Sequence, residues 1–197
     1  ILAEHAHCRQ AASLFDVSHM GQVRLVGGDA AAALESLVPV DVIDLAVGRQ
    51  RFGFFTNDGG GILDDLMIAR RKDDILLVIN AACKQADIRH LTTHIGHRCG
   101  VQSMPERALL ALQGPKAAAA LSRLNPNVTN LVFMSGMPVV LAGALCYITR
   151  SGYTGEDGYE ISVPTEQAVA LAQALLDELL INRDDPKELA EAERLNE

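Results

Sequence analysis

Two stretches of this chain resemble each other, and their repetition constrains the fold more than any other feature. The first, L-V-G-G-D-A-A-A-A-L-E-S-L, ends at Leu37, and the second, A-L-Q-G-P-K-A-A-A-A-L-S-R-L, ends at Leu124. An Ala-rich helix alone is weak evidence of duplication. However, when Leu34 is aligned with Leu121, an offset of 87 residues, the flanking patterns agree as well. In both cases a strand precedes, and a hairpin, an acidic glycine-rich turn, a strand and a helix follow. We therefore predict a duplicated β-α-β-β-α unit.

Local patterns predict which segments form the elements of these units. Good helix formers at helical spacing indicate helices, and short apolar runs bounded by turn residues indicate strands. The expected helices are residues 2–14, 27–37, 84–94, 114–124 and 166–180. The expected strands are residues 21–26, 51–55, 62–69, 75–80, 108–112 and 159–163, with a hairpin at 139–149. Duplicated units of this kind form a mixed or antiparallel sheet with helices packed on one face, so the predicted fold class is α+β.

The repetition also predicts how the chain is divided. Residues 1–104 are expected to form the first half of the core and residues 105–181 the second half. Residues 182–197 are rich in charge and are expected to form an exposed helix or a frayed end. The 197 residues, of which 49% are hydrophobic, suffice for a real core in one or two domains.

Bulk composition excludes some classes of function. The net charge of −8 argues against a general nucleic-acid binder, which needs clustered Lys and Arg. No apolar run is long enough to span a bilayer, so no membrane insertion is expected. The cysteines show no C-x-x-C spacing, which indicates reduced thiols in a cytosolic type of compartment. They are Cys8, Cys83, Cys99 and Cys146.

The segment at residues 57–69, N-D-G-G-G-I-L-D-D-L-M-I-A, places two adjacent carboxylates in an apolar run. If this run is a strand, neighbouring side chains point to opposite faces, so either Asp64 or Asp65 faces inward or lines a cavity. A buried carboxylate is costly unless it is paired or acts on a ligand. The alternative is a hairpin in which the Asp pair caps a turn. The apolar residues on both sides weaken that alternative.

The segment at residues 149–163, T-R-S-G-Y-T-G-E-D-G-Y-E-I-S-V, combines three glycines, two tyrosines and three acids. The glycines permit a tight loop, and Tyr153 offers a flat apolar face with a hydroxyl at its edge. Glu160 enters an apolar strand, where a carboxylate suits a ligand with two adjacent N–H donors, such as the edge of a pterin or a purine. The alternative is a turn in which Glu160 pairs with Arg150. The residues alone leave both possibilities open.

Two further polar clusters are interpreted as structural. His90, His94 and His97 have spacings that bring them near one face of a helix, as metal ligands require. Because Gly96 is expected to end the helix, we predict a solvated helix end and no metal site. The D-x-S-H cluster at residues 16–19 is interpreted as a turn with Asp or Ser capping. Residues that close together cannot easily form the chain of nucleophile, base and orienting acid that a hydrolase needs.

Five motifs, in this order, resemble those of one family. They are L-F-D-V-S-H-M-G, G-G-I-L-D-D-L, V-I-N-A-A, A-L-Q-G-P and S-G-Y-T-G-E-D-G-Y-E. Together they are similar to the aminomethyltransferase, or T-protein, of the glycine cleavage system, within the wider group of folate-binding transferases. The resemblance runs from about residue 1 to residue 180. The Y-T-G-E-D-G form fits T-protein better than the iron–sulfur-assembly relatives, which carry a Cys in a related loop.

The resemblance implies an enzyme that takes an aminomethyl group from the lipoyl arm of H-protein, releases ammonia and passes the one-carbon unit to tetrahydrofolate. Tetrahydrofolate is then the co-substrate, lipoylated H-protein is the protein partner, and neither nucleic acid nor membrane is expected. The implied location is the bacterial cytoplasm, or the mitochondrial matrix if the source is eukaryotic. The alternatives are a non-catalytic folate-binding remnant and a related folate-dependent demethylase.

The same resemblance implies roles for individual residues. The family's essential carboxylate matches Asp65, and its pterin-binding acid matches Glu160. An ionised carboxylate at Asp65 is suited to orienting the folate amines and to stabilising positive charge as ammonia leaves. The positions that line the family's folate pocket are matched by Met20, Phe52, Asn80 and Tyr153.

The chain also departs from the family pattern. Family members continue past the last residue here, with a folate-binding Arg and later domains that close the cavity, and they carry a segment before Ile1. The resemblance therefore predicts a fragment or a truncated gene product. By itself such a chain is expected to be marginally folded, nearly inactive and prone to self-association through exposed apolar side chains.

Overall fold

The computed structural model describes residues 1–180, which form two compact units. Unit 2 comprises Ser18–Arg107 and Met134–Met137. Unit 1 comprises Ile1–Val17, Ala108–Phe133 and the described residues from Pro138 onwards. The charged tail expected at residues 182–197 lies outside the described residues. The division between residues 104 and 105 concerns the halves of a duplication and stays a prediction.

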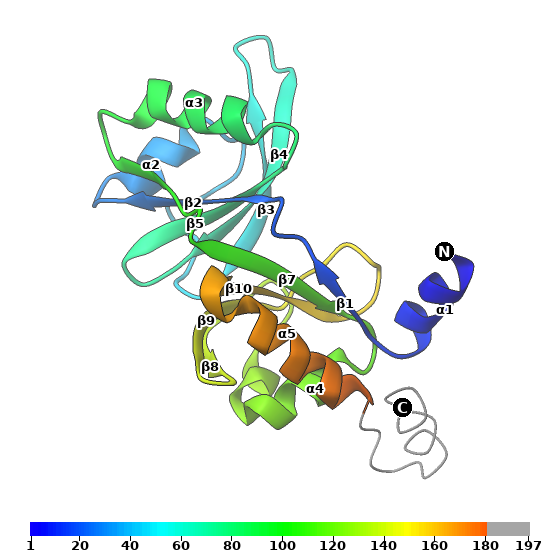
Figure 1. The fold of residues 1–197 in the computed structure, drawn as a ribbon. Coiled ribbons are helices and arrows are strands. Elements are labelled where there is room, and N and C mark those ends of the chain that lie inside the picture. Colours follow the sequence, from blue (N-terminus) through cyan, green and yellow to red (C-terminus); the bar gives the residue numbers. More distant parts are fainter. Residues whose placement is uncertain (181–197) are drawn as a thin grey trace. The chain divides into compact units, whose positions relative to one another are not determined.

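Unit 2 is a five-stranded antiparallel sheet with two helices on one face (Figure 1). The strand order is β3-β4-β5-β2-β6. Its strands are β2 (Gly21–Val26), β3 (Gln50–Thr56), β4 (Ile62–Arg70), β5 (Asp74–Ile79) and β6 (Gly100–Ser103). Its helices are α2 (Ala30–Glu35) and α3 (Lys84–Ile95).

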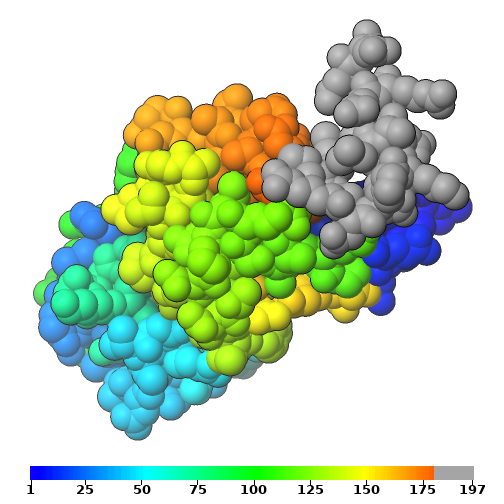
Figure 2. Space-filling model, turned by 90° about the horizontal axis from the view of Figure 1, so that it is seen from below, coloured from blue at the N-terminus to red at the C-terminus, as the bar shows by residue number. Residues whose placement is uncertain are grey.

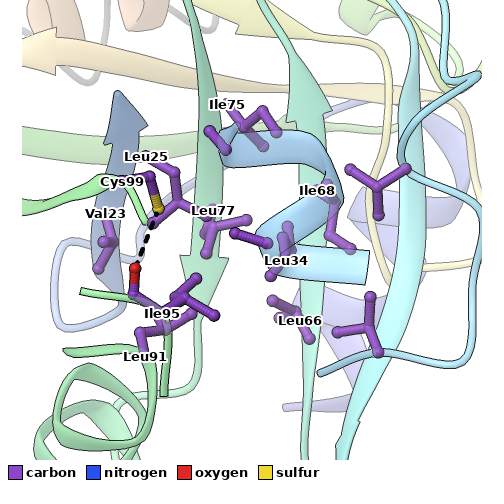
Figure 3. Close-up of a cluster of buried hydrophobic side chains, with 14 of the residues drawn as sticks. Val23, Leu25, Leu34, Leu66, Ile68, Ile75, Leu77, Leu91, Ile95 and Cys99 are labelled. Atoms are coloured by element: carbon purple, nitrogen blue, oxygen red, sulfur yellow. Dashed lines mark hydrogen bonds between the residues drawn. The ribbon is translucent and has the colours of Figure 1, made fainter. Parts of the chain in front are cut away.

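The core of unit 2 fills the space between this sheet face and its two helices (Figure 3). Alternate residues along the strands point towards the helices, because side chains along a strand alternate between faces. Each fully buried aliphatic side chain contributes roughly 1.5–3 kcal/mol relative to exposure. The thiol of Cys99 closes the core and donates to the carbonyl oxygen of Ile95 at 3.7 Å. The main contributors are Val23, Leu25, Leu34, Leu66, Ile68, Ile75, Leu77 and Leu91.

Unit 1 carries the second sheet, with the strand order β1-β7-β10-β9-β8. Its strands are β1 (Ser13–Asp16), β7 (Arg107–Gln113), β8 (Gly136–Leu141), β9 (Ala144–Thr149) and β10 (Gly158–Pro164). Its helices are α1 (Leu2–Gln10), α4 (Ala117–Leu124), α5 (Thr165–Leu180) and the short 3-10 helix η1 (Pro126–Asn130). α4 and α5 contact each other and both contact β10. α5, drawn in orange, lies at the surface of this unit (Figure 2).

The two sheets have the same strand order when their strands are matched along the chain. β2, β3, β4 and β5 of unit 2 correspond to β7, β8, β9 and β10 of unit 1, and α2 and α3 correspond to α4 and α5. Only the fifth strand differs in origin. In unit 2 it is β6, which follows α3, whereas in unit 1 it is β1, which comes from the start of the chain. The predicted α+β fold class is confirmed, with each unit forming its own sheet.

One predicted helix is too long. The spacing of apolar residues predicts a helix over residues 2–14, but α1 ends at Gln10 and Ser13–Asp16 form β1. This strand pairs with β7, so that Leu14 lies opposite Leu112. Pairing with a strand about a hundred residues away outweighs the local helical pattern.

The other predicted elements are present, with ends that shift by a few residues. The expected break at Ala142 and Gly143 is the turn between β8 and β9, where the two residues adopt φ values of 45° and 82°. The short elements β6 and η1 were not predicted. All four cysteines are free thiols. Within residues 1–180, no helix combines the length and the apolar character that crossing a membrane requires.

Candidate functional site

Asp65 and Asn80 meet at one end of the sheet of unit 2, and Met20 lies just before β2 at the same end. Leu66 of β4 pairs with Ile79 of β5, and Ile79 also pairs with Gly21 of β2. Leu66 and Ile79 belong to the helix-covered core, so the neighbouring positions belong to the opposite face, which neither α2 nor α3 covers and which is called the open face below. These neighbouring positions are Asp65, Asn80 and Met20.

The adjacent aspartates point to opposite faces of β4, as the alternation predicts. Asp64 pairs with Phe55, which is fully buried in the core beneath the helices. Asp65 pairs with Phe54, which is half-buried on the other face. Asp65 therefore belongs to the open face, and Asp64 to the face that α3 covers.

The alternative in which the Asp pair caps a turn is wrong. The turn lies earlier, where the Asn57 side-chain oxygen accepts the backbone N–H groups of Gly59 (3.0 Å) and Gly61 (2.8 Å). Gly60 adopts a φ of 77° there, which glycine tolerates without a steric penalty. Both aspartates lie inside β4.

Asn80 connects the two aspartates. Its side-chain Nδ2 donates to Oδ1 of Asp64 (3.1 Å), to Oδ1 of Asp65 (3.1 Å) and to the backbone oxygen of Asp65 (3.2 Å). All three residues are half-buried. The predicted pocket residue Asn80 therefore contacts the predicted catalytic carboxylate directly.

Phe52 lies on the same open face as Asp65. It pairs with Met67, two residues along from the pair formed by Phe54 and Asp65. The rings of Phe52 and Phe54 meet edge to face, with centroids 5.1 Å apart, and Phe52 is 37% exposed. Sequence reasoning did not single out Phe54. The F-G-F-F run, in which alternate aromatic residues share a face, was the signal that could have identified it.

Sequence reasoning also missed the groups behind Asp64. Asp87, in the first turn of α3, is 4% exposed and is in hydrogen-bond contact with Asp64. Burial, followed by this contact and the charges of Asp64 and Asp65, raises the pKa of Asp87 to about 7. Burial and the neighbouring aspartates also raise the pKa of the Cys83 thiol. The available signal was the spacing of Asp87 from Leu91 and Ile95, which at i, i+4 and i+8 places the carboxyl group on the buried face of α3.

In unit 1, Glu160 is a buried carboxylate within β10, 8% exposed. Its Oε2 accepts the hydroxyl of Ser151 at 2.7 Å. Burial raises its pKa, and the hydrogen bond from Ser151 opposes that shift. Within residues 1–180 no other donor reaches Glu160, so the carboxylate retains acceptor capacity for a ligand.

The turn in which Glu160 pairs with Arg150 is not formed. Arg150 binds Asp157 instead through two hydrogen bonds, of 2.9 Å from Nε and 2.6 Å from Nη2. The guanidinium also donates to the backbone oxygen of Leu131 at 2.6 Å. This bidentate pairing holds the pKa of Asp157 below its ordinary value, and the ligand-binding role of Glu160 stays a prediction.

The loop that carries Tyr153 is built around Gln113, the last residue of β7. The Gln113 amide nitrogen donates to the backbone oxygens of Ser151 (2.9 Å) and Tyr159 (3.3 Å). A Cβ atom on Gly152 would overlap the Gln113 side chain. The A-L-Q-G-P motif thus supports the loop, and Tyr153 is presented with its side chain 69% exposed.

The histidines agree with the predicted solvated helix end only in part, because His94 and His97 are exposed whereas His90 is half-buried. α3 ends at Ile95, so His97 lies beyond it, and Nδ1 of His94 contacts the backbone oxygen of His90 at 2.8 Å. His90 packs against Phe55 with ring centroids 5.3 Å apart. In the described part of the chain, no three His, Cys, Asp or Glu side chains are grouped as a metal site requires.

A hollow of about 390 Å³ lies elsewhere in unit 2. It is formed by the end of β2, the start of α2 and the turn between β4 and β5, and Arg70 and Lys72 contribute to its lining. None of the predicted site residues lines it.

Known proteins similar to this chain were found by sequence and by structure. Residues 1–179 match the family described as the GCVT N-terminal domain. The mitochondrial aminomethyltransferase of Dictyostelium discoideum is 41% identical over 186 residues, which cover 89% of this chain and 46% of that protein. The mitochondrial aminomethyltransferase of Pisum sativum is 44% identical over 185 residues, which cover 90% of this chain and 45% of that protein.

A solved structure agrees with these relatives. Glycine cleavage system aminomethyltransferase T from Bartonella henselae has a TM-score of 0.82 and 43% identity, covering 89% of this chain and 48% of its own. The chain thus spans about half the length of the relatives it matches. Because the match extends over nearly all the described residues, the chain belongs to the GCVT N-terminal domain family.

Proposed function

We propose that this chain is the N-terminal part of an aminomethyltransferase of the glycine cleavage system. The whole enzyme transfers a one-carbon unit from an aminomethyl-lipoyl carrier protein to tetrahydrofolate and releases ammonia. The observation that carries the proposal is the contact of Asp65 with Asn80 on the open face of the sheet in unit 2. The matched relatives, which are named aminomethyltransferases, support it.

Asp65 is assigned the catalytic role. As the aminomethyl group loses ammonia, positive charge develops at its carbon, and an ionised carboxylate held close to that carbon stabilises the charge. Asn80 holds the Asp65 carboxylate through its Nδ2 and leaves its own Oδ1 as an acceptor. Phe52 supplies apolar surface on the same side of the sheet, and Met20 lies just before β2 at the end where Asp65 and Asn80 meet.

Glu160 is assigned to the pterin edge of tetrahydrofolate. A buried carboxylate with spare acceptor positions is stabilised in its ionised form by a ligand that offers two adjacent N–H donors. Tyr153 offers an exposed aromatic surface in the loop before β10, suited to the flat face of such a ligand. Glu160 and Tyr153 are thus the two side chains that support tetrahydrofolate as the ligand.

Lipoylated H-protein is the proposed protein partner, since it carries the aminomethyl group in this reaction. The proposed location is the mitochondrial matrix in a eukaryote and the cytoplasm in a bacterium. The mitochondrial names of the Dictyostelium and Pisum relatives support the first of these.

The proposal is tested with the full-length protein, aminomethyl-lipoyl H-protein and tetrahydrofolate. Ammonia and methylene-tetrahydrofolate are measured together, and equal amounts of the two support the proposal. Folate binding without either product would indicate a non-catalytic remnant. Transfer from N-methylated amines, with none from the lipoyl donor, would indicate a demethylase.

A further inference from the structure

A pair of carboxyl groups lies behind Asn80, on the helix-covered side of the sheet in unit 2. One belongs to Asp64 of β4 and the other to Asp87 of α3, and their side chains lie within hydrogen-bonding reach of each other. Two ionised carboxylates offer acceptors only, so a hydrogen bond between them requires a proton.

One oxygen of each carboxyl group lacks any donor. Oδ2 of Asp64 and Oδ2 of Asp87 are both buried, and neither has a hydrogen-bond partner in the described part of the chain. Buried polar atoms are almost always hydrogen-bonded, so each unpartnered oxygen requires an explanation. A single proton held between the two groups supplies a partner and removes one of two buried like charges.

Among residues 1–180, none of the groups that act on Asp87 is a cation. The groups that face Asp87 are Asp64 and Asp65 on β4, and the Cys83 thiol that precedes α3 stands beside all three carboxyl groups. On α3 itself, the Lys84 side chain lies against Gly21, and burial lowers the pKa of His90. On α2, Glu35 accepts the backbone N–H groups of residues 42 and 43. The pair therefore relies on a proton.

We propose that Asp64 and Asp87 share one proton and that this pair positions Asp65 through the side chain of Asn80. Asp64 keeps its Oδ1 as the acceptor for Asn80 Nδ2 at 3.1 Å, and the same nitrogen donates to Asp65 Oδ1 at 3.1 Å. The side-chain amide of Asn80 is thereby held between Asp64 and Asp65, with its Nδ2 directed at both carboxyl groups. The positioning role rests on the proposed function, whereas the shared proton does not.

Protonation of the pair follows from its burial. The pKa of Asp87, raised to about 7, keeps the proton in place at and below neutral pH. Above about pH 7, Asp87 ionises next to Asp64. Repulsion between the two carboxylates then disturbs Oδ1 of Asp64, the acceptor that holds Asn80. Stability is expected to decline as the pH rises from about 4 to about 7, because Asp87 ionises first in the unfolded chain, and folate binding is expected to decline as the pH passes about 7.

The shared proton is tested by carbon-13 NMR of the aspartate side chains in the full-length protein. The expected result is that two aspartate signals move together near neutral pH and that Asp87→Asn removes this titration, because its N–H replaces the proton permanently. Asp58→Asn, in the exposed turn before the same strand, is the control and leaves the titration in place. If every aspartate titrates only in the acidic range, or if the neutral titration survives Asp87→Asn, the shared proton is excluded.

The positioning role is tested by a double-mutant cycle on kcat/KM with Asp64→Ala and Asn80→Ala. If Asp64 acts through Asn80, the double variant loses no more kcat/KM than Asn80→Ala alone. Its kcat/KM is then at least about threefold higher than the product of the two single losses predicts. Asp64→Asn should restore most of the loss in Asp64→Ala, since its oxygen accepts from Asn80 while its N–H donates to Asp87. The positioning role is overturned if the kcat/KM losses of the two single variants multiply in the double variant and follow the changes in melting temperature. A wild type without transfer activity would instead refute the proposed function, and the NMR titration would still decide the shared proton.

Discussion

The two sheets share one strand order but hold their acidic groups in different ways. In unit 2, Asp65 lies on an open face, and Asn80 donates to it. In unit 1, Glu160 is enclosed within β10 and receives one hydroxyl donor from Ser151. The comparison teaches that the repeated topology provides a frame, while the chemistry of each copy depends on which side chains occupy it.

The units also differ in what stabilises a carboxyl group. In unit 1, Asp157 is paired with the guanidinium of Arg150, which lowers the pKa of the carboxyl group. In unit 2, Asp87 is buried and faces other acids, and both its burial and these acids raise its pKa. One unit therefore uses a cation and the other a proton, and their stabilities should respond to pH in opposite directions.

The largest expected effect separates the two adjacent aspartates. Asp65→Asn should lower the single-turnover rate of the full-length enzyme by about 10²–10³, because a charge that acts in the transition state is lost. Asp64→Asn should change mainly stability, since Asp64 lies on the helix-covered face. Rates and melting temperatures of both variants are compared. A greater rate loss for Asp64→Asn would place the chemistry on the other face of β4.

The second prediction concerns Glu160, the buried acid of unit 1. Glu160→Gln places an N–H group against a ligand donor, so tetrahydrofolate binding should weaken by about 1–3 kcal/mol. Isothermal titration calorimetry measures the change. The control is Glu156→Gln in the preceding loop, whose partner is Arg9 at 3.1 Å and which should leave affinity unchanged. Equal affinities of wild type and Glu160→Gln would remove Glu160 from the site.

The third prediction tests the loop around Gln113. Gly152→Ala puts a methyl group into the space that the Gln113 side chain occupies, so the free energy of unfolding should fall by about 1–3 kcal/mol. Gly28→Ala in unit 2 is the control, because a Cβ atom there meets nothing within 4 Å. Urea denaturation compares the two variants. Similar stabilities would show that the loop does not depend on close contact with Gln113.

The smallest expected effect tests the opposite pH responses. Asp157 has a lowered pKa, so its contribution is present above the ordinary value of 3.8 and is lost as the pH falls. Because the carboxylate is more than a third exposed, Asp157→Asn should cost only about 0.5–1 kcal/mol at neutral pH. Asp87 has a raised pKa, so stability falls as the pH rises from about 4 to about 7, and Asp87→Asn removes that fall. Unfolding free energies are measured from below pH 3.8 to above about pH 7, and the comparison is contradicted if the pH dependences that the two substitutions remove have the same sign.

Most secondary structure was predictable because it follows local patterns. The runs that form β4, β5 and β10 carry the apolar character and turn boundaries of strands, and the helices α3 and α5 carry good helix formers. The helix expected at residues 2–14 failed at its C-terminal part, where β1 pairs with β7. That pairing depends on a strand far along the chain, which no local window contains.

The candidate site was likewise predictable only where it depends on a local pattern. The alternation of β4 was enough to predict that Asp64 and Asp65 point to opposite faces, but not which of the two faces the helices. The choice between Arg150 and a ligand for Glu160 also stayed open. The bidentate contact of Arg150 with Asp157 excluded the first, and the ligand stays a prediction. Asp87 was not anticipated, because its partner Asp64 lies on a different element.

The sequence by itself determined the repeated order of elements, the family and the opposite directions of the adjacent aspartates. These properties depend on local period and on ordered motifs, which a chain displays before it folds. Only the tertiary structure decided that Asn80 joins Asp64 to Asp65, and that Asp87 stands behind them. Such contacts depend on strand register and on helix packing, which are set by burying the whole core of unit 2 rather than by any one segment.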